Sequence, residues 1–150
     1  MKLNKVLPVL AVASFCLVAC QSKVDYAKFH EDALNVKANP YAKATVKVDS
    51  KSSVAGVSTE VKGTIHYTYG NGWAVKDEDQ TLDNAAAIVI ASAALALTAA
   101  TVGEDDSATY YSGGGFKVSY EGGLVREFNE YGLQTSYKDG GTKVSISYAK

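Results

Sequence analysis

The sequence is poor in residues that cross-link a chain or bind metals. Its 150 residues include only 2 Cys, 2 His, 2 Pro, 1 Met and 1 Trp. Two cysteines cannot supply the disulfide framework of a small secreted scaffold, and two histidines without ligand spacing do not indicate a zinc site. With 47% hydrophobic and 21% charged residues, the composition is that of a globular domain and excludes wholesale disorder or collagen-like repetition.

An excess of positive charge is also lacking. The chain has 15 basic and 16 acidic residues, a formal charge of −1 and a pI near 6.1. Because a nucleic-acid-binding domain is usually strongly basic, we expect no nucleic-acid partner. No repeat and no low-complexity linker divides the chain, so the length predicts one domain.

The N-terminus is typical of a secretory signal. Lys2 and Lys5 precede an apolar run over residues 6–18, and the small residue Ala19 follows it. A membrane-spanning helix needs about 20 apolar residues, so an uncleaved anchor is a poor interpretation of this shorter run. An ordinary secretory signal cleaved nearby remains an alternative.

Leu17, Val18, Ala19 and Cys20 resemble the lipobox of bacterial lipoproteins. The resemblance implies that residues 1–19 are removed and that Cys20 is acylated, for example with palmitate, as the new N-terminus. It predicts a lipid-anchored protein of the cell envelope, with residues 20–24 as a short tether. In a Gram-negative organism, Gln21 in place of Asp would favour the outer membrane.

Loss of Lys2 and Lys5 would leave 13 basic and 16 acidic residues, a formal charge of −3. Residues 20–76 contain 8 lysines and 5 acids, whereas residues 77–150 contain 5 basic and 11 acidic residues. The basic half near the anchor could lie on anionic lipid. The alternative is an ordinary spread of surface lysines.

Hydrophobic periodicity predicts an α+β domain over residues 25–150. Residues 25–36 have the pattern of an amphipathic helix, and residues 44–48 and 61–69 alternate as strands joined by a turn around 49–53. The C-terminal part predicts a meander with Gly-rich turns, its strands at residues 108–112, 116–120, 124–128, 133–137 and 142–148. Together these give a curved antiparallel sheet of about 6–8 strands, packed by two helices.

The second helix is expected at residues 85–102, eighteen uncharged residues of which nine are alanine. Ala and Leu favour helix, and this length gives about five turns. A helix that is apolar all round should be buried on most sides. Three interpretations stay open: a core helix packed on the sheet, a transmembrane helix, or the wall of an apolar cavity.

The order of lipobox, helix, antiparallel strands, covering helix and further strands resembles the half-barrel lipoprotein carriers of bacterial envelopes. The resemblance implies an apolar or amphipathic ligand, such as a lipid, between sheet and helix. We therefore expect Ile88, Ile90, Leu95 and Leu97 to contact ligand. The alternative function is a structural or adhesion-like interaction surface with a plain packed core, for which the ten tyrosines offer contact area.

No catalytic pattern is present: the sequence has no G-x-S-x-G, H-E-x-x-H or P-loop motif. We expect His30 to be a solvated residue of the first helix and His66 to lie on the strand face opposite Val61 and Ile65. The acidic triplets at residues 77–79 and 104–106 bracket the predicted central helix, which would hold them too far apart for a Ca²⁺ site. The sequence thus predicts no enzyme activity, no cofactor and no metal.

Overall fold

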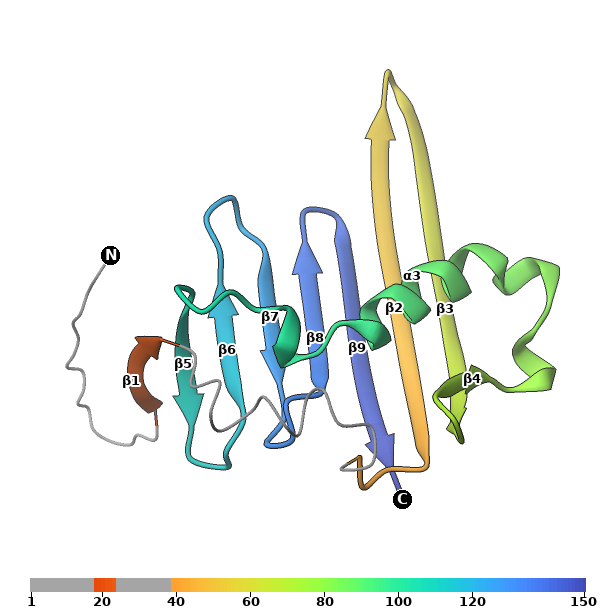
Figure 1. The fold of residues 1–150 in the computed structure, drawn as a ribbon. Helices are drawn as coiled ribbons and strands as arrows, with labels where there is room; N and C mark the ends of the chain where they lie inside the picture. The colour runs from red at the N-terminus through yellow and green to blue at the C-terminus, as the bar shows by residue number, and fades with distance from the viewer. Residues whose placement is uncertain (1–17, 24–38) are drawn as a thin grey trace.

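The computed structural model describes residues 18–23 and 39–150. These form one antiparallel sheet of nine strands in the order β1-β5-β6-β7-β8-β9-β2-β3-β4, with a helix lying across one face (Figure 1). The strands are β1 (Val18–Lys23), β2 (Lys43–Val54), β3 (Val57–Tyr69), β4 (Trp73–Val75), β5 (Ser107–Tyr111), β6 (Phe116–Ser119), β7 (Val125–Phe128), β8 (Gln134–Asp139) and β9 (Thr142–Ala149). The antiparallel sheet with a helix on it confirms the predicted class, and the N-terminal helix predicted at residues 25–36 lies outside the described residues.

The first hairpin is longer than the sequence predicted. Strands β2 and β3 pair over their whole length, from Lys43↔Thr68 to Val54↔Val57. The turn consists of Ala55 and Gly56, both with positive φ, which is the backbone of a tight two-residue hairpin turn. The predicted turn around residues 49–53 is therefore wrong. These polar residues continue strand β2 into the part of the hairpin that is exposed on both faces, where a strand needs no apolar side chains.

The predicted C-terminal meander is confirmed in strands β5 to β9, each paired with the next. Strand β4 has only three residues, too few to give a recognisable alternation. Strand β1 comes from the segment predicted to hold the cleavage site and tether. These two edge strands bring the sheet to nine.

Helix α3 (Ala85–Ala96) confirms the alanine-rich helix but ends six residues before the predicted boundary. Leu97 is extended, Thr98 forms a β-bridge with Leu133, and the Ala99 N–H donates to the Gly132 carbonyl at 2.8 Å. A 3₁₀ turn, η5 (Ala99–Thr101), follows. Hydrogen bonds to the sheet thus replace the helical ones that the composition favoured.

One face of α3 packs on the sheet. Its buried residues are Ala87, Ala91, Ala94 and Leu95, and they cover Val46, Ile65, Val144 and other buried residues of β2, β3 and β9. The other side of the helix is apolar but open, and Val89 is 70% exposed. The expectation that this helix is buried on most sides is therefore wrong for the part of the chain that the structure describes.

A second cluster lies beneath η5. Phe116 and Phe128 stack with ring centroids 4.7 Å apart, and the buried group is completed by Ala99, Val102, Ala108 and Val118. Both clusters lie on the face crossed by α3, which we call the inner face. The inner face is thus covered at two places, by α3 and by η5.

None of the helices among the described residues is long and apolar enough to cross a membrane.

Candidate functional site: a groove beside helix α3

A groove of about 310 Å³ runs between α3 and strands β8 and β9. This volume is at the lower end of the roughly 300–1,000 Å³ range of small-molecule sites. Its lining is mainly apolar, and the residues are Val89, Ile90, Ala93, Ala94, Leu97, Tyr137, Asp139, Thr142 and Val144. The groove is an open channel at the helix edge, which suits an elongated apolar ligand better than a compact polar one.

Of the four residues predicted to contact ligand, two line the groove and two pack on the core. Ile90 and Leu97 line the groove. Leu95 is buried against the sheet with 5% exposure, and Ile88 is half-buried and packs on the same core. Leu95 lies four and eight residues after Ala91 and Ala87, so the helical period turns it toward the sheet.

Polar groups lie among the groove residues of β8 and β9. The Tyr137 hydroxyl is 3.5 Å from the Asp139 carboxylate, and Thr142 pairs with Asp139 across the hairpin. Partial burial, followed by the negative charge of Asp139, raises the pKa of Tyr137. Tyr137 is a neutral hydroxyl at physiological pH whose proton faces Asp139, and its oxygen can accept a hydrogen bond from a ligand.

Arg126 fixes the segment at the C-terminal end of α3. This side chain is 5% exposed, and its Nε donates to Gln134 Oε1 at 2.7 Å. Its terminal nitrogen donates to Thr101 Oγ1 at 2.7 Å and to the Thr98 carbonyl at 3.4 Å. The positive charge thus lies near the negative end of the helix dipole, where it is favourable.

Gln134 extends this contact to the helix itself. The Gln134 amide is fully buried and donates to the Ala94 carbonyl at 2.8 Å, satisfying one of the acceptors that a helix leaves free at its C-terminus. Neither Arg126 nor Gln134 was predicted from the sequence. The signal for Arg126 was its position two residues before Phe128, which turns both to the same face of a strand.

Several tyrosines have structural roles. Tyr67 is buried below α3, and its hydroxyl is 2.8 Å from Ser92 Oγ, which accounts for a serine in an apolar helix. The Tyr148 hydroxyl donates to the Gln134 carbonyl at 2.7 Å, and its ring stacks on Tyr41 with centroids 5.2 Å apart. Burial raises the pKa of Tyr148 strongly. These rings belong to the packing of the sheet.

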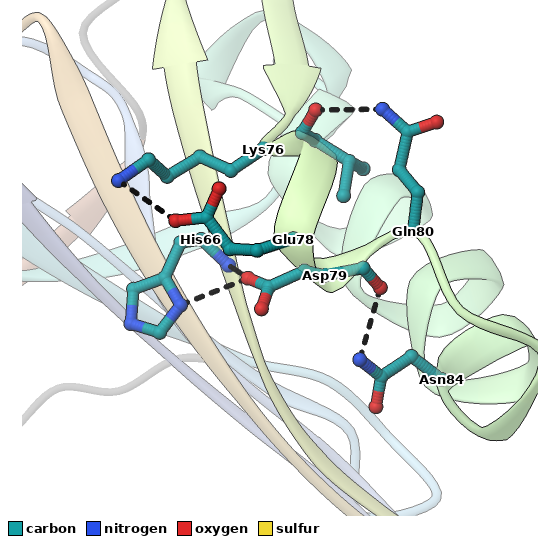
Figure 2. A network of polar contacts seen from close by, with 7 residues as sticks. His66, Lys76, Glu78, Asp79, Gln80 and Asn84 are labelled. Atoms are coloured by element: carbon teal, nitrogen blue, oxygen red, sulfur yellow. Dashed lines mark hydrogen bonds and ion pairs between the residues drawn. The ribbon is translucent and has the colours of Figure 1, made fainter.

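A polar network holds the connection from β4 to α3 against the sheet edge (Figure 2). The Asp79 carboxylate accepts from the His66 backbone N–H at 2.6 Å and lies 2.8 Å from His66 Nδ1. The Asn84 amide donates to the Asp79 carbonyl at 2.9 Å. Because Asp79 takes the free N–H of strand β3, this network has an evident structural role.

The first acidic triplet forms the 3₁₀ turn η3 (Asp77–Asp79), and its Glu78 and Asp79 side chains make contacts in this network. Glu78 pairs with Lys76 at 3.4 Å. In the other triplet, the Asp106 carboxylate accepts from the Gly103 N–H at 2.8 Å. Within residues 18–23 and 39–150, no group of three or more His, Cys, Asp or Glu residues is arranged to hold a metal ion.

Cys20, the predicted acylation site, lies in strand β1. This strand pairs with β5 through Gln21↔Thr109, Ser22↔Ala108 and Lys23↔Ser107. The Tyr110 hydroxyl donates to the Lys23 carbonyl at 3.1 Å, and Lys23 pairs with Asp105 at 3.3 Å. Cleavage before Cys20 would leave these three strand pairs intact.

No protein-family model, curated protein or solved structure matches this chain.

Proposed function

We propose that this protein is a lipid-anchored lipoprotein of the bacterial envelope that binds an apolar or amphipathic ligand in the groove between α3 and strands β8 and β9. The observation that carries the proposal is the groove of about 310 Å³. One wall is the apolar, exposed side of α3 at Val89 and Ile90, and the opposite wall includes Tyr137 and Val144. An apolar cleft with a few polar groups is the usual form of a small-molecule site.

The ligand class follows from the lining. The apolar walls suit a hydrocarbon chain, and Tyr137, Asp139 and Thr142 offer hydrogen bonds to a polar group. The core below α3 is closely packed, so the ligand lies beside the helix rather than between helix and sheet. This placement differs from the enclosed cavity that the carrier resemblance implied.

Anchoring depends on Cys20, whose acylation the lipobox resemblance predicts. Two or more acyl chains give durable membrane attachment. The edge position of β1 in the sheet supports the proposal, because acyl groups there would extend from one side of the folded domain without disturbing its core. The groove would then work close to a membrane.

Binding of a fluorescent fatty acid tests the groove. Ala93 lines it, whereas Ala96 is exposed on the same helix and does not. Ala93→Phe fills the channel and should abolish dye binding, while Ala96→Phe should leave it unchanged. Absence of binding by the parent protein, together with absence of lipid in organic extracts of the purified protein, would contradict the proposal.

A second function, a protein-interaction module, is favoured by the hairpin of β2 and β3. Its end projects past the neighbouring strands (Figure 1), and the paired residues Val54 and Val57 there are 72% and 68% exposed. Exposed valines on a projecting hairpin suit contact with another protein. Replacing both with threonine should abolish such an interaction without changing dye binding to the groove.

A further inference from the structure

The two sides of the sheet differ sharply in charge. Side chains that alternate with the buried residues point to the face opposite α3, which we call the outer face. In strands β2, β3 and β6 to β9 it bears seven lysines and three acids, a formal charge of +4; these are Lys43, Lys47, Lys51, Lys62, Lys117, Lys138, Lys143, Asp49, Glu60 and Glu127. Lys23 of β1 and Lys76 after β4 follow the same alternation, and each is paired with an acid, Asp105 and Glu78. The rest of residues 39–150 has 3 basic and 10 acidic residues, a formal charge of −7.

Strand register places these lysines in neighbouring rows. One row, read across β8, β9, β2 and β3, is Lys138, Lys143, Asp49 and Lys62. Lys138 lies directly opposite Lys143, and like charges in that position destabilise a sheet. Only Asp49 separates Lys143 from the next lysine of this row.

The next row places Lys47 between Ser145 and Thr64. On the same face, Glu60 is the acid that pairs with Lys51 at 3.4 Å and with Lys62 at 3.8 Å. Lys43, Lys47, Lys138 and Lys143 have no ion-pair partner among the described residues. The outer face is therefore a broad basic surface on which the lysine ammonium groups, and hydroxyls such as those of Thr64 and Ser145, can donate hydrogen bonds.

We propose that the outer face lies on a bilayer containing anionic phospholipid. Lysines near such a surface are attracted to it, and the acidic residues of the rest of the domain would be repelled from it. The sheet would rest on the headgroups with α3 and its groove directed away. Phosphate and glycerol oxygens would accept from the lysine, serine and threonine side chains.

The choice of a bilayer over a soluble polyanion rests on the proposed acylation of Cys20. Strand β1 is part of the same sheet, so an anchor at Cys20 holds the sheet within reach of the membrane. The anchor would thus hold the basic outer face at the membrane surface, where anionic headgroups are concentrated. The charge distribution itself stands independently of the anchor.

Lysine footprinting on vesicles tests the proposal with the whole protein. The purified chain is mixed with vesicles of phosphatidylcholine, with or without phosphatidylglycerol, and acetylation of each lysine is followed by mass spectrometry. Phosphatidylglycerol should slow acetylation of Lys43, Lys47 and Lys143 several-fold and leave Lys150, which strand alternation turns away from the outer face, unchanged. High salt should reverse the protection, because it screens exposed charges.

Charge reversal supplies matched variants. Lys143→Glu should sharply reduce the protection of Lys43 and Lys138, whereas Lys150→Glu, an equal change in net charge, should preserve it. Equal acetylation on both kinds of vesicle overturns the proposal. So does protection of the outer face by a soluble polyuronate but not by phosphatidylglycerol.

The mass of the N-terminal peptide reports acylation separately. If the precursor is not acylated but attaches to the vesicle through its apolar residues 6–18, the lysines of the outer face should still be protected. If the chain has neither kind of anchor, the fraction that floats with phosphatidylglycerol vesicles measures binding of the outer face alone. Failure of the anchor and failure of the outer face are therefore distinguishable.

Discussion

The Cβ atom of Ala87 in helix α3 lies over Gly63 of strand β3, only 2.8 Å from where a Cβ on that glycine would be. The missing side chain lets the helix backbone approach the sheet closely. Ala87, Ala91 and Ala94 keep most of the contact face thin, and Leu95 is the one large side chain among its buried residues. This packing explains why the helix is rich in alanine.

Gly63→Ala should destabilise the fold by about 1–3 kcal/mol, because the added methyl group overpacks the contact with Ala87. Urea denaturation gives the free energy of unfolding. Gly70→Ala is the control, since a Cβ there meets nothing within 4 Å and the glycine has no positive φ. Equal stability of the two variants would show that α3 can shift away from the sheet.

Leu95→Asp should cost about 3 kcal/mol or more, because it removes a buried apolar side chain and buries an unpaired charge. Ala86→Asp provides the control: Ala86 is exposed in the first turn of α3, where a negative charge complements the helix dipole. Thermal unfolding of both variants measures the difference. A tolerated Asp at position 95 would mean that α3 does not pack on this face.

Arg126→Met should destabilise the fold by about 1–3 kcal/mol, because it leaves Gln134 Oε1 and Thr101 Oγ1 without their donor. Lys117→Met on the adjacent strand points to the outer face and should have little effect. Hydrogen exchange should also quicken at residues 98–102 in the Arg126 variant alone. Unchanged exchange there would contradict the role of Arg126 in holding η5.

The network of Figure 2 predicts a dependence of stability on pH. The hydrogen bond from the His66 backbone N–H lowers the pKa of Asp79 below its usual value of 3.8. This contribution is present above pH 3.8 and is lost as the pH falls through the folded-state pKa. The melting temperatures of the parent and Asp79→Asn should differ at neutral pH and converge in acid; a constant difference would exclude this origin.

Cys20→Ser should abolish acylation and leave the precursor uncleaved. Metabolic labelling with a clickable fatty acid measures acylation, and the mobility of the precursor reports cleavage. Cys16→Ser is the matched control, because Cys16 lies within the predicted signal and should not be modified. Labelling that survives the loss of Cys20 would refute the lipobox interpretation.

The sequence by itself determined the local elements. Alternation in β2, β3 and the C-terminal meander predicted antiparallel strands, because side chains on successive strand residues point to opposite faces. Alanine composition predicted a helix beginning at Ala85, since helix propensity is a local property. That Ile90 and Leu97 contact a ligand stays a prediction; both line the groove.

Only the tertiary structure decided where these elements end and which faces they share. Helix α3 ends at Ala96 because Thr98 pairs with Leu133 and Gln134 takes the Ala94 carbonyl, contacts between residues far apart in the chain. Burial of Leu95 and the neighbouring rows of lysines on the outer face likewise depend on strand order and register. Local periodicity cannot specify these, because they arise from packing between distant segments.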